Sequence, residues 1–133
     1  APVRLERMLR GAAGGWGALA GETGRRVLLD WRAGDAMVIA DRGRLAQLFS
    51  NLVANAVDHG RGPVEIRGRR VRGAVRVEVS DRGPAPRVRG RTSGDHGHGL
   101  QVAAAAAEEA GGRLAVEGSE EATTVAVELP LAE

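Results

Sequence analysis

The chain of 133 residues contains no cysteine, which excludes disulfides, zinc–thiolate sites and thiol nucleophiles. It contains no tyrosine, and its two tryptophans and one phenylalanine are too few for the stacking platforms of a nucleic-acid binder. No apolar run is long enough to cross a bilayer, and the N-terminus lacks the basic-then-apolar order of a signal peptide. We therefore expect a soluble, cytoplasmic chain that contacts neither nucleic acid nor membrane directly. Whether the parent protein is membrane-anchored stays open.

Lysine is also absent, so all nineteen basic residues are arginines, against seventeen acidic residues and a net charge of +2. The arginines are spread along the chain rather than clustered, which also argues against nucleic-acid binding. The length suits one hydrophobic core and is too short for two ordinary domains. We expect residues 1–133 to form a single domain.

Apolar periodicity predicts three helices. Near-helical spacing covers residues 3–20, although glycines weaken the pattern there. Residues 42–58 carry the strongest helical pattern in the chain, with Asp41 as a suitable N-cap and Gly60 as a suitable stop. A third helix is expected to begin at Gly99.

Runs rich in β-formers predict three adjacent pairs of strands. The strands are expected at residues 25–34, 35–41, 63–71, 74–81, 113–119 and 123–131. Residues 82–98 are rich in glycine, proline and polar residues and lack an apolar period, so they predict a long loop. This order of elements favours an α/β two-layer sandwich, in which a mixed, largely antiparallel sheet is covered on one face by about three helices.

Two asparagines interrupt the apolar pattern of the predicted helix at residues 42–58. Asn51 and Asn55 lie one turn apart on the same flank as Asp58, with His59 near the border, so they sit at the rim of the core. Mg²⁺ typically takes one or two protein oxygens together with waters and phosphate oxygens, and an asparagine carbonyl is a suitable oxygen. Asn55 is therefore a candidate magnesium ligand. The alternative is that both asparagines are merely solvated at the helix flank.

Two short motifs could contact a phosphorylated ligand. Asp81 ends a predicted strand and is followed by Gly83, which combines a carboxylate acceptor with a backbone that a ligand can approach closely. The segment from Gly97 through Gly99 to Leu100 leads from the long loop into a helix, whose free N-terminal amides and dipole suit a phosphate. Each motif is weak by itself.

In this order the motifs resemble those of the ATP-binding domain of sensor histidine kinases, in the GHKL or Bergerat-fold superfamily. The N box is matched by RLAQLFSNLVANAVDHG, the G1 box by VEVSDRGPA, the G2 box by GHGLQVAAAAAEEAGGRL and the final strand by ATTVAVELPL. The resemblance covers the chain from about residue 3 onward. The family fold is a two-layer α/β sandwich, which agrees with the architecture expected from periodicity.

The resemblance implies the catalytic domain of a bacterial two-component protein-histidine kinase that uses ATP and Mg²⁺. Asn55 would hold Mg²⁺, Asn51 would be the catalytic residue in the phosphate region, and Asp81 would accept a hydrogen bond from the adenine amino group. The implied nucleotide-binding residues are Asn51, Asn55, His59, Asp81, Gly83, Gly97, Gly99, Leu100 and Thr123. The histidine that receives the phosphoryl group would lie on a dimerisation domain of the same kinase, outside this chain, and a response regulator would act downstream.

The chain departs from the family pattern at three points. Ala85 stands where a second glycine of the G1 box is usual, and Asp58 stands where a basic residue is common. The ATP lid, expected at about residues 82–98, is shortened. Two alternatives follow: a degenerate GHKL module with little nucleotide affinity that acts by protein docking, or a serine kinase of the anti-sigma-factor type, which would usually carry an acidic residue in place of Asn51.

Overall fold

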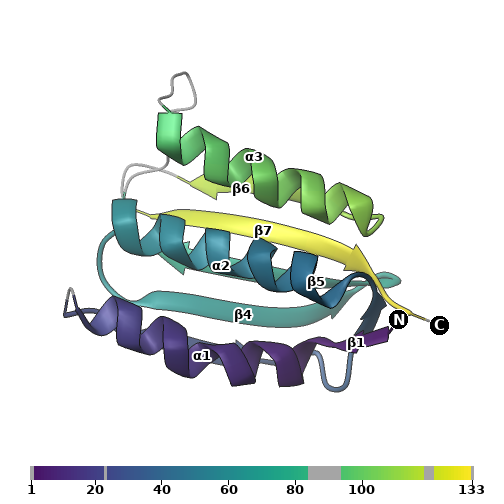
Figure 1. The fold of residues 1–133 in the computed structure, drawn as a ribbon. Coiled ribbons are helices and arrows are strands. Elements are labelled where there is room, and N and C mark those ends of the chain that lie inside the picture. Colours follow the sequence, from purple (N-terminus) through teal and green to yellow (C-terminus); the bar gives the residue numbers. More distant parts are fainter. Residues whose placement is uncertain (1, 23, 84–93, 119–121, 133) are drawn as a thin grey trace.

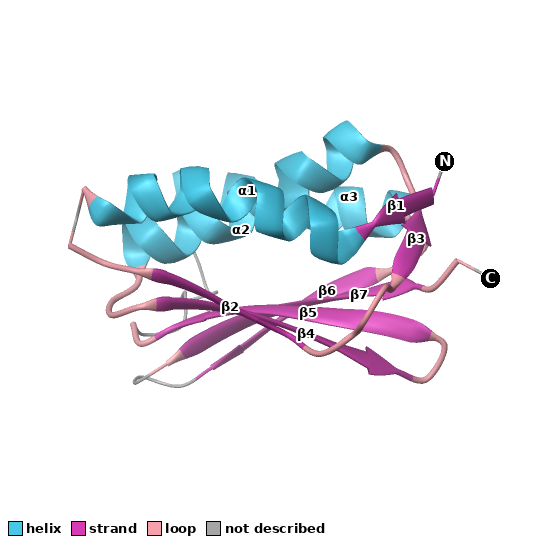
Figure 2. Ribbon diagram, turned by 90° about the horizontal axis from the view of Figure 1, so that it is seen from below, coloured by secondary structure: helices cyan, strands magenta, loops and turns pink. Residues whose placement is uncertain are grey.

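The computed structural model describes residues 2–22, 24–83, 94–118 and 122–132; of Leu19, His59 and residues 94–99 it describes the backbone alone. Figure 2 shows two layers, with helices on one face of a twisted sheet and the other face open. The helices are α1 (Leu5–Gly21), α2 (Arg42–His59) and α3 (Gly94–Glu109). In the described part of the chain, no helix combines the length and the apolar character needed to span a membrane.

The main sheet has five strands in the order β2-β4-β5-β7-β6. They are β2 (Val27–Trp31), β4 (Val64–Val71), β5 (Ala74–Asp81), β6 (Arg113–Gly118) and β7 (Thr123–Pro130). Strand β2 runs parallel to β4, and every other neighbouring pair is antiparallel. The prediction of a mixed, largely antiparallel sheet covered on one face by helices is confirmed.

The prediction that residues 25–34 and 35–41 form adjacent strands is wrong. Strand β3 (Met37–Ile39) pairs instead with β1 (Pro2–Arg4) in a separate two-stranded sheet, so the chain is extended where a helix was expected to begin at residue 3. Strands β2 and β3 were both visible as apolar runs, whereas β1 was not. Their partners were not, because side-chain alternation reports which face is buried and carries little information on which strand lies alongside.

Helix α2 lies across the middle of the sheet and supplies much of the core (Figure 1). Its buried apolar side chains are those that the periodicity predicted: Leu45, Leu48, Phe49, Leu52, Val53, Ala56 and Val57. Full burial of a leucine or phenylalanine contributes roughly 1.5–3 kcal/mol, so this stripe fixes the rotation of the helix about its axis. At the N-terminus, Asp41 Oδ1 accepts a hydrogen bond of 3.1 Å from the amide of Arg44, which confirms the predicted cap.

Helix α3 begins at Gly94, five residues before the predicted start at Gly99. The apolar pattern marks only the part of a helix that packs on the core, which here starts at Leu100. Backbone hydrogen bonds extend a helix without any apolar side chain, so periodicity could not find the first turns. Of the predicted loop at 82–98, residues 84–93, including Ala85, lie outside the described residues.

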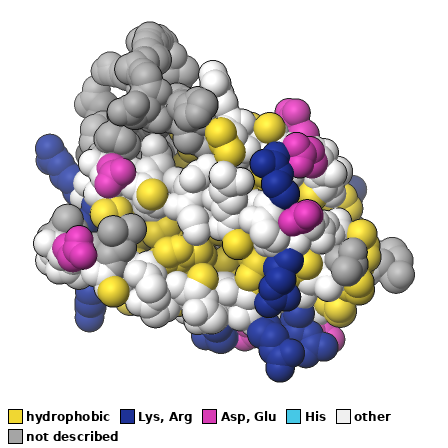
Figure 3. Space-filling model, viewed as in Figure 1, with side chains coloured by type: hydrophobic (Ala, Val, Ile, Leu, Met, Phe, Trp, Pro, Cys, Tyr) yellow, Lys and Arg dark blue, Asp and Glu magenta, His cyan; other side chains and the backbone are white. Residues whose placement is uncertain are grey.

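An ion pair joins α2 to α3 on the helical face. The guanidinium of Arg44 donates hydrogen bonds of 3.0 and 2.7 Å to the two carboxylate oxygens of Glu109. In Figure 3, basic and acidic side chains lie next to each other at the right-hand edge of this face, where α2 begins and α3 ends. Both side chains are largely exposed, so the pair adds little to the stability of helix packing, which comes from the apolar side chains that the two helices bury in the core.

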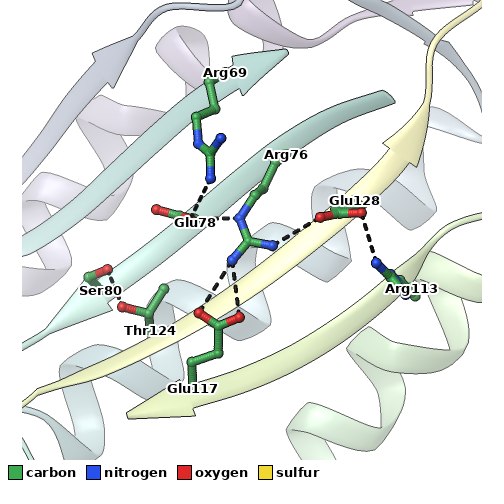
Figure 4. A network of polar contacts seen from close by, with 8 residues as sticks. All are labelled: Arg69, Arg76, Glu78, Ser80, Arg113, Glu117, Thr124 and Glu128. Atoms are coloured by element: carbon green, nitrogen blue, oxygen red, sulfur yellow. Dashed lines mark hydrogen bonds and ion pairs between the residues drawn. The ribbon is translucent and has the colours of Figure 1, made fainter. Parts of the chain in front are cut away.

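The open face of the sheet carries a network of arginine and glutamate side chains (Figure 4). Arg76 of β5 lies at its centre, with contacts of 2.7 Å to Glu78, 3.0 Å to Glu128 and 3.1 Å to Glu117. The hydrogen bond from Arg76 lowers the pKa of Glu128, although partial burial acts in the opposite direction, and Arg113 contributes further lowering. The network lets three neighbouring strands present charged side chains on one face without leaving the central guanidinium unpaired.

Candidate functional site

One end of the sandwich brings together the residues that the motifs singled out. Helix α2 and strand β5 end there, and β7 and α3 begin there, at the end opposite the two chain termini (Figure 1). Within the sheet, Asp81 at the end of β5 is the antiparallel partner of Thr123 at the start of β7. The topology thus joins three motifs that lie far apart in the sequence.

The carboxyl group of Asp81 is buried in a cradle of backbone. Its side chain is only 7% exposed, and Oδ1 accepts a hydrogen bond of 2.6 Å from the amide of Gly83. A β-carbon added at Gly60 would overlap this carboxyl group, and one added at Gly83 would lie 2.8 Å from the Cα of Gly60. Both positions therefore require glycine, because the backbone of residues 60 and 83 lies too close to neighbouring atoms to leave room for a β-carbon. The two glycines pack against the carboxyl group.

The environment of Asp81 acts on its pKa in two directions. Burial raises the pKa of the carboxyl above its ordinary value, because the charged form loses hydration. The amide of Gly83, the positive charge of Arg25 and the amide of Arg61 each lower it. A buried carboxyl that is held by backbone donors and lies at the end of a strand is a functional-site candidate on physical grounds.

Thr123 closes a ring of contacts with Asp81 and Gly83. Its side chain is 3% exposed, and Oγ1 donates a hydrogen bond of 3.0 Å to the carbonyl oxygen of Gly83. Gly83 is therefore held by its amide to Asp81 and by its carbonyl to Thr123. This bracing fixes the chain immediately after β5.

Asn51 and Asn55 lie on α2 with half-buried side chains, and neither amide makes a hydrogen bond to another described residue. The helical rise of 1.5 Å per residue puts them about 13 Å and about 7 Å along the helix from Gly60. Asp58, which fitted a phosphate site least well, is exposed. Two half-buried amides without a hydrogen bond to another described residue thus lie within about three turns of the Asp81 cradle.

The side chains at this end of the sandwich could bind a magnesium ion only together with a ligand that supplies further oxygen atoms. In the part of the chain that the structure describes, no group of three histidine, aspartate or glutamate side chains could hold a metal ion. The unengaged amide oxygen of Asn55 fits a cation that takes most of its ligands from phosphate and water, as Mg²⁺ does. The residues present therefore fit a phosphate-bound magnesium and not an all-protein metal cage.

The remaining predicted residues lie near the ends of α2 and α3. His59 is the last residue of α2, and Leu100 is partly buried against the core. Gly97 and Gly99 lie inside α3 rather than before it.

Sequence reasoning missed two residues of this site. Gly60 was interpreted only as the stop of α2, and its contact with Asp81 could not be anticipated from a glycine in that position. Arg25, whose charge acts on Asp81, carried no signal at all, because it is one of nineteen dispersed arginines.

Comparison with known proteins identifies the family to which the chain belongs. The family model for histidine kinase-, DNA gyrase B-, and HSP90-like ATPases matches residues 40–133. The sensor histidine kinase MtrB of Mycobacterium leprae is 37% identical over 82 residues, which cover 61% of this chain and 15% of MtrB. The chain therefore corresponds to a small part of the curated relatives that it matches.

Solved structures share the fold over almost the whole chain. The nucleotide-free catalytic domain of histidine kinase ThkA has a TM-score of 0.84 at 22% identity, over 98% of this chain and 95% of that one. Full-length ShkA in complex with AMPPNP has a TM-score of 0.86 at 28% identity, over 99% of this chain and 31% of that one. The expected fold class is thereby confirmed.

Proposed function

We propose that this chain, which belongs to the family of histidine kinase-, DNA gyrase B-, and HSP90-like ATPases, is the catalytic domain of a sensor histidine kinase and transfers the γ-phosphoryl group of ATP to a histidine outside this chain. The observation that carries the proposal is the buried Asp81 carboxyl group in its glycine cradle, next to the end of the helix that carries Asn51 and Asn55. The carboxyl group is held by the amide of Gly83 in close contact with Gly60, at the end of the strand where a ligand can approach.

At the adenine end, Asp81 accepts a hydrogen bond from the exocyclic amino group of the base. An ionised carboxylate can only accept, and adenine presents a donor at this position where guanine presents an acceptor. The amide of Gly83 holds the carboxylate, and the hydroxyl of Thr123 holds Gly83 through its carbonyl oxygen. The proposed site therefore selects adenine over guanine.

At the phosphate end, Asn55 holds Mg²⁺ through its side-chain oxygen, and Asn51, one turn earlier, orients the terminal phosphate. When bound, the ion neutralises charge that builds up on the phosphate oxygens during transfer. His59, Gly97, Gly99 and Leu100 line the phosphate region in this proposal. Residues 82–98 act as the ATP lid.

In the reaction, the bond between the β,γ-bridging oxygen and the γ-phosphorus breaks, a bond from the histidine nitrogen to phosphorus forms, and ADP leaves. The domain positions the nucleotide and supplies no acceptor. The acceptor histidine belongs to a dimerisation domain of the same kinase, and a response regulator receives the phosphoryl group afterwards. We place the domain in the cytoplasm, with no nucleic acid and no membrane as direct partner.

Calorimetric titration with Mg-ATP and with ADP tests the proposal. We expect saturable binding that Asp81→Asn abolishes and that Asn55→Ala makes insensitive to magnesium. Matched controls are Asp30→Asn, an exposed aspartate on β2, and Gln47→Ala, an exposed amide on the same helix as Asn55. Both controls should bind as the wild type does.

Absence of binding at millimolar nucleotide would overturn the kinase proposal and favour a degenerate module that acts by docking. If nucleotide binds, addition of an acceptor domain with radiolabelled ATP tests the transfer itself. Label on a serine of a partner protein instead of a histidine would favour the serine kinase alternative.

A further inference from the structure

Arg25 lies in the connection between α1 and β2 and reaches across to the end of α2. Its backbone amide donates to the carbonyl oxygen of Ala20 at 3.0 Å, which anchors the residue at the end of α1. Its side chain then enters the end of the sandwich where Asp81 is buried, close enough for its charge to act on that carboxyl group. Arg25 lies outside the four sequence motifs that indicate the family.

Two hydrogen bonds fix the guanidinium of Arg25 to the backbone at the end of the sandwich that carries the candidate site. Nη1 donates to the carbonyl oxygen of Val57 at 2.6 Å, and Nε donates to that of Gly62 at 2.7 Å. Val57 comes two residues after Asn55, and its carbonyl is one of the last four of α2, which have no partner within the helix. A cation at this position also complements the helix dipole.

The connection from α2 to β4 is held from the other side by the end of β5. The carbonyl oxygen of Arg61 accepts a hydrogen bond of 2.8 Å from the amide of Arg82, and the amide of Arg61 lowers the pKa of the Asp81 carboxyl. Arg25 therefore contacts the segment from Val57 to Gly62 on one side, and the strand end that carries Asp81 contacts it on the other.

The third nitrogen of the guanidinium is unusual. Nη2 is buried and has no hydrogen-bond partner among the described residues. A buried donor without a partner is costly, so its presence calls for compensation. The charge of Arg25 also acts on the Asp81 carboxyl, whose pKa it lowers against the larger raising effect of burial.

We propose that Arg25 is a positioning residue for the nucleotide: it holds the last turn of α2 and the connection to β4, to which the end of β5 is hydrogen-bonded, and its positive charge favours the ionised Asp81 carboxylate. This inference rests on the proposed function, in which Asp81 and Asn55 act on nucleotide. The described groups that act on Asp81 are Arg25 and the amides of Gly83 and Arg61; Asp58, the acidic residue near the end of α2, is exposed.

The test compares Arg25→Gln and Arg25→Lys with the matched control Arg70→Gln. Arg70 also donates to a backbone carbonyl, that of Ala33 at 2.9 Å, but it lies toward the opposite end of β4. Affinity for ADP is measured by calorimetry between about pH 5 and about pH 8, and folding is checked by thermal melts.

We expect Arg25→Gln to bind ADP at least about tenfold more weakly than the wild type at neutral pH. Affinity should decline on acidification when Asp81 takes up a proton, and without the arginine charge this decline should begin at a higher pH. Arg25→Lys keeps the charge and loses the fork of hydrogen bonds, so its affinity should fall while its pH profile stays close to that of the wild type. Arg70→Gln should match the wild type in both.

Wild-type affinity and pH profile in a folded Arg25→Gln would overturn the inference, and so would an equal loss at every pH, which indicates a merely structural role. If Arg25→Gln does not fold, Arg25→Lys decides: unchanged affinity there overturns the positioning role. Failure of the wild type to bind ADP would instead overturn the proposed function, so the two failures are distinguishable.

Discussion

The sharpest test of the Asp81 cradle is the substitution Gly60→Ala. The added β-carbon would overlap the Asp81 carboxyl group and lie 2.6 Å from the carbonyl oxygen of Ala56, well inside the usual contact of about 3.5–4.0 Å. Gly60 has φ −101° and ψ −169°, an extended conformation that alanine adopts freely, so the cost comes from overlap alone. Overpacking of this kind costs about 1–3 kcal/mol. At roughly 4 °C per kcal/mol for a domain of this size, the melting temperature should fall by about 4–12 °C.

The same overlap should move the carboxylate away from the base. We expect ADP affinity to drop at least about tenfold, the loss of one hydrogen bond to a charged group, when measured by calorimetry at a temperature where the variant is folded. Gly14→Ala is the matched control, because a β-carbon there meets nothing within 4 Å, and it should bind like the wild type. The cradle would be refuted if Gly60→Ala melted within about 1 °C of the wild type and bound ADP equally well.

Three further outcomes follow from the structure. Gly14→Ala and Gly15→Ala, at exposed interior positions of α1, should each add about 0.5–1 kcal/mol of stability in thermal melts, and a loss would contradict the open space around them. Because burial raises the pKa of Asp81, the folded state binds its proton more readily and stability falls as pH rises past the ordinary carboxyl value. Asp81→Asn without nucleotide should therefore melt higher than the wild type at neutral pH, with the gain vanishing in acid; a pH-independent difference would oppose this. Arg76 lowers the pKa of Glu128, which contributes stability above the ordinary value of that carboxyl and loses it as pH falls. Urea unfolding of Arg76→Met should thus show a larger deficit at neutral pH than in acid, and an equal deficit would count against the network.

The amphipathic elements could be predicted from the sequence. The stripe from Leu45 to Val57 fixed both the extent and the buried face of α2, and Asp41 marked its start. The β4–β5 hairpin was equally visible, because alternation with a short turn is a local pattern. The order of the motifs also indicated the family, which the comparisons confirm for residues 40–133.

What the sequence could not supply was the choice of partners across the fold. Nothing local pairs β3 with β1 in place of β2, or starts α3 at Gly94. The candidate site divides in the same way: Asp81 and Thr123 were identified by motif, but the glycine packed against the carboxyl group and the arginine whose charge lowers its pKa were not.

The physical reason is the range over which each signal acts. Side-chain periodicity is set within a few residues and reports which face of an element is buried, so it survives in the sequence alone. The contacts of Arg25 with Val57 and Gly62 span 32 and 37 residues, and they exist only once α1, α2 and β4 are packed. The sequence by itself determined the elements and the chemical groups of this protein, and tertiary packing decided how those groups face one another.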